Sequence, residues 1–364
     1  STQWPIFHVE TFTLPPDDGY PLFITANRYW DDHSTWQGSN GKRHIEDKDA
    51  KSGLTLICLH STSFHKEVWE ACLETLFRIV RATIPGRDSV TIREAWSIEA
   101  PNHGDSASLN WNALRRPPFA TRFGCEGYSR AAHRFLTKGR VPFHERNLVG
   151  IGHSLGANAI LMLQTFSPSL PFKSLVIVEP MVSPGGDDVL QPLRARLVRA
   201  SERRRDSWAS LDEARGSLPG RVRSMRKGDG KRPWDDRVVE AFLSHGIRPR
   251  RNSAELPVTA KFALACTKEQ EIVMYEDREG SEAPVKALDK ILPTLPIHLV
   301  LGEIKDYLPL RVHEMLTGPT SEGKYASVKI LPHVGHLIPQ EQPDALAEAI
   351  AQALCPNSSP RCRL

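Results

Sequence analysis

Short apolar runs alternate with helical patterns along most of this chain of 364 residues, and this alternation constrains the fold most. LTLICLH (54–60) is apolar without interruption, which is typical of a strand that is buried on both faces. Strands that alternate with helices predict a doubly wound, mostly parallel sheet. The predicted fold class is therefore α/β. The expected strands cover 7–14, 22–30, 54–60, 90–101, 148–152, 172–180, 296–303 and 326–332.

A long segment at 182–290 interrupts this alternation. It is helical in pattern, basic and broken by prolines. We predict that it is a helical cap inserted into a core made of residues 1–181 and 291–364. Doubly wound sheets bind ligands at the carboxyl ends of their strands, so we expect the cap to lie over that edge.

The stretch LVGIGHSLGANAI (148–160) places one serine between two glycines, at the point where a strand pattern changes to a helix pattern. Gly152, Ser154 and Gly156 form the pattern G-x-S-x-G. A sharp turn from strand to helix strains the residue at the corner and needs small neighbours. It also holds the serine hydroxyl at a helix N-terminus, where developing negative charge is favoured. We predict that Ser154 is a nucleophile, although the same pattern also fits a tight turn with a capping serine.

A serine nucleophile needs a base, and in this architecture the base follows the last strand. His336 lies there, in LPHVGHLIPQ, with His333 three residues earlier. We favour His336, because Gly335 gives its loop the freedom to bend over Ser154.

Two carboxylates are candidates for the acid that orients the base. Glu179 ends the strand SLVIVE, where a buried carboxylate would need a partner such as an imidazolium. Asp306 follows the next strand, in the commoner place, but it is one residue further from Gly302 than usual. We favour Glu179, and Asp306 stays as the alternative.

The remaining parts of the predicted site lie close to these residues in the sequence. Backbone N–H groups must stabilise the oxyanion, and we expect them from Leu155 and Thr62, with Ser63 as the alternative to Thr62. The same loop and strand ends supply the expected substrate-binding residues, which are His60, Phe64, His153 and Met181.

Charge and cysteine content limit the possible partners. The chain carries 47 basic and 43 acidic residues, but 17 basic and 8 acidic residues lie in 190–251, including 203–205 and 221–232. This segment is either a solvated face or a rim that attracts an anionic substrate. No aromatic-interleaved basic strand accompanies it, so we do not expect nucleic acid as a partner. The six cysteines are scattered without metal-ligand spacing, and we expect no metal or other cofactor and no membrane span.

The ordered set His60…Trp69, Gly152–Gly156, the strand ending at Glu179, Gly302 and Gly335-His336 resembles the α/β-hydrolase superfamily. More narrowly, HSTSFHKEVWE and AWSIEAPNHGDSASLN resemble a fungal branch of toxin and secondary-metabolite pathways that includes a peroxisomal acyl-CoA hydrolase. Members of that branch have an acid after the strand that follows the nucleophile helix, which also implies Glu179. One departure is Ser61, where the family usually has glycine.

The sequence ends in NSSPRCRL, and Cys362-Arg363-Leu364 fits the small–basic–leucine pattern of a peroxisomal address. We therefore expect a peroxisomal import receptor as a partner, and a cytoplasmic location if the address is not used.

Together these features predict a serine hydrolase that cleaves an ester or thioester, and an acyl-CoA of a fungal secondary-metabolite pathway is one candidate substrate. Two alternatives stay open. One is a cyclase, lyase or transferase that uses the same pocket without net hydrolysis, because fold does not fix reaction. The other is a scaffold without activity.

Overall fold

The computed structural model describes residues 7–31, 53–82, 90–218, 232–250, 259–321 and 323–355. Its main sheet has eight strands in the order β1-β2-β4-β3-β5-β6-β10-β11. β2 is antiparallel to β1 and to β4, and the other neighbouring pairs are parallel. The predicted α/β fold class is confirmed. The strands are β1 (His8–Leu14), β2 (Ile24–Trp30), β3 (Leu54–Leu59), β4 (Ile92–Ile98), β5 (Asn147–His153), β6 (Phe172–Val178), β10 (Ile297–Gly302) and β11 (Ser327–Leu331).

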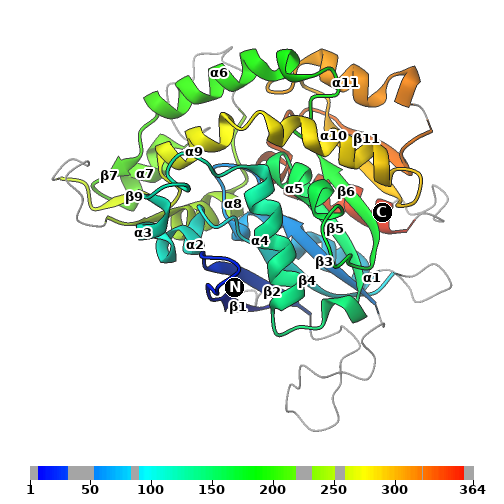
Figure 1. Ribbon diagram of the computed structural model, residues 1–364, viewed down its shortest axis with the longest axis horizontal. Helices are drawn as coiled ribbons and strands as arrows, with labels where there is room; N and C mark the ends of the chain where they lie inside the picture. Colours follow the sequence, from blue (N-terminus) through cyan, green and yellow to red (C-terminus); the bar gives the residue numbers. More distant parts are fainter. Residues whose placement is uncertain are drawn as a thin grey trace, which may run out of the picture.

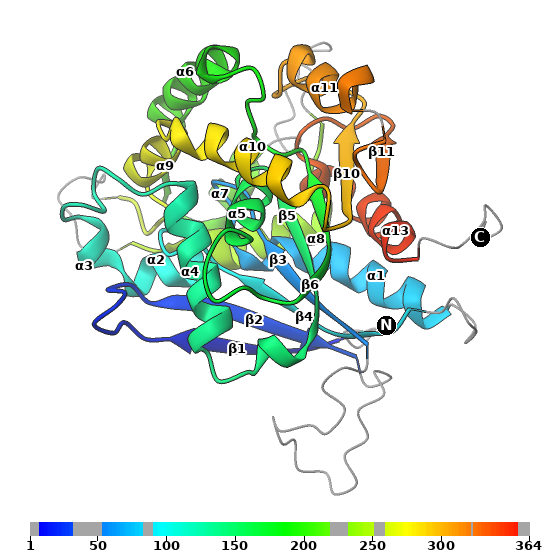
Figure 2. The same ribbon diagram turned by 45° about the vertical axis from the view of Figure 1, so that its right-hand side comes forward.

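Helices cover both faces of this sheet. α1 (Glu70–Ala82) and α13 (Pro343–Leu354) lie together on one face, and α4 (Cys125–Lys138), α5 (Leu155–Leu163) and α10 (Glu279–Ile291) lie on the other (Figures 1 and 2). The helices have long apolar faces, as in α1, where Leu73, Leu76 and Phe77 are buried. The central strands of a sheet that is covered on both sides are nearly continuous in apolar residues.

β3 shows how this requirement is met. Its odd-numbered residues Ile57 and Leu59 belong to the apolar cluster beneath α4 and α5, whereas Leu56 and Cys58 belong to the cluster beneath α1 and α13. Successive side chains of a strand point to opposite faces, so an uninterrupted apolar run serves both clusters at once. The two apolar clusters, one on each face of the sheet, therefore hold β3 in place.

The segment between β6 and β10 contains most of the predicted cap. α6 (Asp187–Arg203) lies beside α9 (Lys268–Tyr275) in both views. The helical description is incomplete, because β7, β8 and β9 form a separate three-stranded antiparallel sheet in the order β7-β9-β8. These strands are two or three residues long, too short to leave a readable alternation in the sequence. The elements of the segment are α6, β7 (Ser207–Trp208), α7 (Leu211–Ser217), α8 (Asp236–Ala241), η3 (Phe242–Gly246), β8 (Ile247–Pro249), β9 (Phe262–Leu264), α9 and α10.

The boundaries of the cap at 182 and 290 stay a prediction. α10, which lies within 182–290 apart from its last residue, packs against α5 and α4 on the face of the main sheet. The remaining short elements are η1 (Lys66–Trp69), α2 (Gly104–Leu109), α3 (Trp111–Leu114), η2 (Phe143–Glu145), α11 (Leu310–Thr317), η4 (Pro319–Ser321) and α12 (Ile338–Glu341).

Some predictions fall on residues outside the described ranges. They include the C-terminal tripeptide Cys362-Arg363-Leu364 and residues 221–231 of the basic segment, and they stay predictions. Within the described ranges, no helix is both long enough and apolar enough to cross a membrane.

Candidate active site

The turn from β5 into α5 has the strained geometry that the G-x-S-x-G pattern predicts. Ser154 is the N-cap of α5 and has φ +55° and ψ −117°. Non-glycine residues rarely adopt a positive φ, and such strain persists only where the surrounding structure holds it. Here the Ser154 N–H donates to the carbonyl of Val178 at 2.9 Å, which ties the corner to β6.

The two glycines of the pattern are needed for close packing. A Cβ atom on Gly152 would lie 2.4 Å from the carbonyl oxygen of Gly156, and one on Gly156 would lie 2.1 Å from that of Leu59. Both distances are far below van der Waals contact with backbone atoms that cannot move aside. The helix therefore starts directly against β3 and β5, and Ser154 is held at the sheet edge.

Three side chains from distant parts of the sequence form one hydrogen-bonded line at this edge. His336, in the loop between β11 and α12, has its Nε2 3.0 Å from Ser154 Oγ. Its Nδ1 lies 3.1 Å from Oε2 of Glu179, which follows β6 directly. A carboxylate accepts hydrogen bonds only, so Nδ1 carries the proton and Nε2 is free to accept the serine proton.

Glu179 is tightly held. Its other oxygen, Oε1, accepts the Gly302 N–H at 2.7 Å, and its backbone N–H donates to the Val300 carbonyl at 2.9 Å. The side chain is only 1% exposed. These bonds orient the carboxylate toward the imidazole.

The side chain of Asp306, the alternative acid, bonds the backbone of His336 instead of its imidazole. Its Oδ1 accepts the His336 N–H at 2.9 Å, and its Oδ2 is paired with Arg232. Asp306 therefore shapes the loop of His336 without touching the imidazole nitrogens in the described contacts. His333, the alternative base, points into solvent, with 88% of its side chain exposed, and pairs with Glu303.

The amides that we expect to stabilise an oxyanion belong to Leu155, which follows Ser154, and to Thr62. Leu155 is the first residue of α5, so its N–H has no preceding carbonyl within the helix to bond. Thr62 and Ser63 lie in the loop after β3 and line the same pocket as Ser154. The Ser63 N–H donates to Nε2 of His103 at 3.0 Å, so this amide is already used. Thr62 is therefore the better partner for Leu155.

A pocket of about 250 Å³ opens above Ser154 and His336. Two of the predicted substrate-binding residues, Phe64 and Met181, line it. Elements of the 182–290 segment form much of its wall. The wall residues from that segment are Leu197, Ala200, Ser201, Arg204, Trp234, Phe242, Glu271 and Tyr275.

The other two predicted substrate-binding residues, His60 and His153, are not among the described residues that line the pocket, which differs from the prediction. His60 Nε2 accepts the Ala100 N–H at 3.1 Å, and its Nδ1 lies 2.8 Å from the Ser61 carbonyl. His153 Nε2 donates to the His336 carbonyl at 2.8 Å. Burial lowers the pKa of His60 to about 3 and holds the pKa of His153 well below its usual value. Both are neutral supports of the backbone, and neither is among the described residues that line the pocket.

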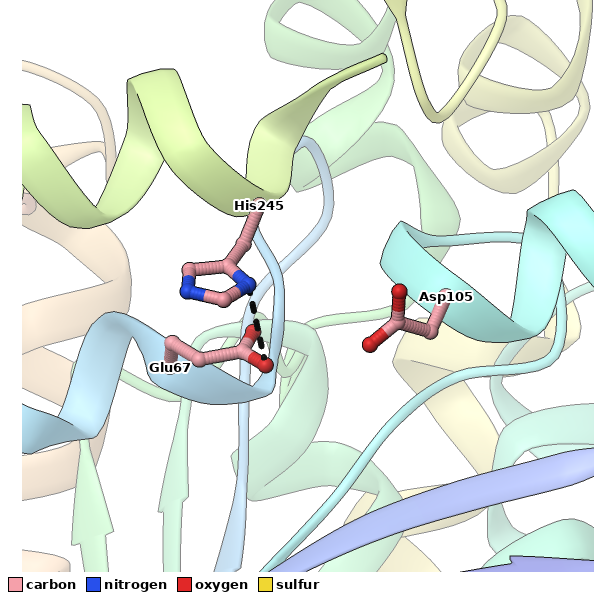
Figure 3. A group of neighbouring side chains, drawn as sticks. All are labelled: Glu67, Asp105 and His245. Atoms are coloured by element: carbon pink, nitrogen blue, oxygen red, sulfur yellow. Dashed lines mark ion pairs between the residues drawn. The ribbon is translucent and has the colours of Figure 1, made fainter. Parts of the chain in front are cut away.

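One group of side chains has the composition of a metal site. Glu67, Asp105 and His245 lie close together, with His245 and Glu67 pointing toward each other from η3 and η1 (Figure 3). Lys66 already supplies a cation, since its Nζ lies 2.7 Å from Glu67 and 2.6 Å from Asp105. Burial lowers the pKa of Lys66, but the surrounding carboxylates outweigh burial and hold it above its usual value. A metal ion would have to displace this ammonium.

Much of the charge of the basic segment is paired within the molecule. Arg204 pairs with Glu271 at 3.0 Å, and Arg205 pairs with Glu213 at 2.6 Å. Arg232 pairs with Asp306 and with Glu341. Of the three arginines at 203–205, Arg203 and Arg205 are exposed, and only Arg204 is among the pocket residues.

Comparison with known proteins decides the family. The model of the alpha/beta hydrolase family matches residues 56–349, which is most of the chain. The chain belongs to this family. The predicted superfamily resemblance is confirmed.

Individual relatives of this alpha/beta hydrolase are distant. The abhydrolase domain-containing protein ACTT2 of Alternaria alternata is 22% identical over 57% of this chain and 82% of its own length. The solved structure of the peroxisomal alpha-beta-hydrolase Lpx1 of Saccharomyces cerevisiae is similar with a TM-score of 0.68. It is 19% identical and covers 99% of this chain and 93% of its own. A thioesterase domain from the curacin biosynthetic pathway has a TM-score of 0.59 and 14% identity, and covers 94% of this chain and 99% of its own. At these identities the solved structures show the fold alone.

Proposed function

We propose that this alpha/beta hydrolase is a serine hydrolase that cleaves a carboxylic ester or thioester. The observation that carries the proposal is the line Ser154 Oγ, His336 Nε2, His336 Nδ1 and Glu179 Oε2, with successive contacts of 3.0 and 3.1 Å. In a Ser-His-acid triad the serine is the nucleophile, the histidine is the base and the acid orients the histidine.

The proposed reaction has two halves. Ser154 Oγ attacks the carbonyl carbon while His336 Nε2 takes its proton, and Glu179 stabilises the imidazolium. The Leu155 and Thr62 amides stabilise the oxyanion. The bond to the leaving group then breaks, and His336 gives the proton to the departing alcohol or thiol. Water repeats the sequence on the acyl-enzyme, which releases the acid and restores Ser154.

A fluorophosphonate probe tests the nucleophile, since it forms a covalent adduct with an activated serine. We expect one adduct on Ser154 in the intact protein and none in Ser154→Ala. The matched control is Ser201→Ala, which removes another buried serine of the same pocket and should keep the label. An adduct on a different residue, or none on a folded protein, would contradict the proposal.

A CoA thioester is the finer proposal for the substrate, and it rests on the sequence resemblance and on the basic segment. The pairing of Arg204, Arg205 and Arg232 leaves less free charge for the phosphates of CoA than the sequence alone suggests. The test compares one acyl group on CoA and on N-acetylcysteamine, which lacks the phosphates, over a salt series. If the protein recognises CoA, the KM for the CoA thioester should be lower than the KM for the N-acetylcysteamine thioester, and the KM for the CoA thioester should rise with salt. Equal and salt-independent KM values would exclude it.

Hydrolysis is also tested against transfer or cyclisation, the alternative within the fold. Reaction in ¹⁸O-labelled water should place one labelled oxygen in the released acid. A product without the label would assign the chain to the alternative chemistry.

A further inference from the structure

Part of the pocket lining is a polar group that the proposed triad does not use. It consists of Ser63 from the loop after β3, Arg204 at the end of α6, and Glu271 and Tyr275 of α9, all of which line the pocket. Ser63 is next to Thr62, so this group lies beside the expected oxyanion position. The function proposed above leaves these four residues without a role.

The contacts within the group converge on one carboxylate oxygen. Oε1 of Glu271 accepts a hydrogen bond from Ser63 Oγ and lies 3.0 Å from Nη2 of Arg204. Tyr275 OH lies 3.2 Å from Ser63 Oγ. Glu271 is nearly fully buried, whereas the Arg204 side chain is 31% exposed. The carboxylate therefore holds the guanidinium in place, and Arg204 is the more accessible partner of the pair.

Hydrogen-bonding capacity remains in this group. Glu271 Oε2 and Arg204 Nε are both buried and have no hydrogen-bond partner among the described residues. Arginine carries five N–H donors, and the ion pair uses only part of them. These two buried atoms can therefore form further hydrogen bonds, the oxygen as acceptor and the nitrogen as donor, with a group bound in the pocket.

We infer that Arg204, held by Glu271, binds a second, uncharged oxygen group of the substrate, either a hydroxyl or a keto group. Such a group accepts a hydrogen bond from the guanidinium, and Tyr275 adds a neutral donor and acceptor. A carboxylate fits less well, because the buried charge of Glu271 already neutralises Arg204. This inference rests on the proposed function and specifies its substrate class.

The oxygen group belongs to the acyl part of the substrate. The pocket of about 250 Å³ contains Ser154 and His336. We assign it to the acyl group, because the acyl group is the portion that stays attached to Ser154 after the leaving group departs. We place the alkyl chain of this acyl group against Phe64, Phe242 and Leu337 and its oxygen against Arg204.

The test uses N-acetylcysteamine thioesters with one leaving group and four acyl groups: butanoyl, 3-hydroxybutanoyl, 3-oxobutanoyl and succinyl. Each kcat/KM is divided by the rate of spontaneous hydrolysis, which removes differences in reactivity. We expect the hydroxy or oxo compound to exceed butanoyl by about tenfold or more, since sites built to bond a substrate oxygen discriminate strongly against analogues that lack it.

Variants assign this preference to the proposed residues. Arg204→Met keeps much of the side-chain volume and should reduce the preference to less than about threefold. Arg203→Met, the matched control on the exposed neighbour, should leave it unchanged. Glu271→Gln, which weakens the hold on Arg204, should reduce it in part. No preference in the intact protein, an unchanged preference in Arg204→Met, or succinyl as the best substrate would each overturn the inference.

Two further readouts separate this inference from the proposed function. Fluorophosphonate labelling of Ser154 in Arg204→Met shows whether the variant is folded and has a working serine, and Arg203→Met should label at the rate of the intact protein. If the intact protein fails to label, the proposed function fails instead. Calorimetric binding of 3-hydroxybutanamide and butanamide to Ser154→Ala then tests the polar group without turnover. Equal affinities for the two amides would overturn the inference.

Discussion

Replacing each candidate acid by its amide discriminates between the two carboxylates near His336. Glu179→Gln keeps the shape and can still accept the Gly302 N–H, but it can present an NH₂ group to His336 Nδ1. That contact favours the wrong tautomer of the imidazole and removes the charge that stabilises the imidazolium. We expect kcat to fall by roughly 10³–10⁴-fold, or about 4–5.5 kcal/mol in the activation free energy.

Asp306→Asn should cost much less. The amide oxygen can still accept the His336 N–H, and what is lost is mainly the charge opposite Arg232, in a pair whose side chains are 22% and 26% exposed. Partly exposed pairs contribute at most about 1 kcal/mol, so we expect less than a tenfold loss. The assay is steady-state hydrolysis of one thioester by both variants, with circular dichroism to compare folding. A larger loss in Asp306→Asn than in Glu179→Gln would refute the assignment of the acid.

Three other predictions concern stability. Gly156→Ala should lower the free energy of unfolding, measured with denaturant, by about 3 kcal/mol or more, because its Cβ would lie 2.1 Å from a backbone oxygen. The control is Gly216→Ala, whose Cβ would have nothing within 4 Å, and it should change the free energy of unfolding by less than about 1 kcal/mol. Burial raises the pKa of Glu70 from 4.5 to about 7, so the folded state keeps a proton that the unfolded state releases, and stability falls as pH rises through this window. Glu70→Gln should remove up to about 3 kcal/mol of that fall. The prediction fails if the free energy of unfolding has the same pH profile in Glu70→Gln and in the intact protein. Lys66→Met should destabilise by about 3–5 kcal/mol, because it leaves three carboxylates without their buried cation, and a melting temperature within a few degrees of the original would contradict this.

Local patterns made the sheet and the centre of the site predictable. The turn at Ser154 is specified within five residues, because the two glycines and the serine are needed at one corner. Glu179 and His336 could be proposed because parallel strands end at one edge, so residues that follow different strands meet there. The structure brings these three side chains into hydrogen-bonding contact.

Features that depend on distant partners were not predictable in the same way. Ser63 and Glu271 are 208 positions apart, and nothing near either residue in the sequence indicates the other. The strands of the small sheet at 207–264 are stabilised by one another and are too short to show a period. His60 and His153 were misassigned for a related reason, since proximity to the site in sequence does not show whether a side chain faces the pocket or the core.

The most direct test of the proposed catalytic pair Ser154 and His336 is the rate of covalent labelling of Ser154, measured by intact-protein mass spectrometry with a fluorophosphonate. We expect one adduct, mapped by peptide analysis to Ser154, in the intact protein. We also expect labelling to be slower by a factor of about 10² or more in His336→Ala, because the serine then lacks its base. The same labelling rate in His336→Ala, or an adduct outside Ser154, would contradict the claim that these two residues act together.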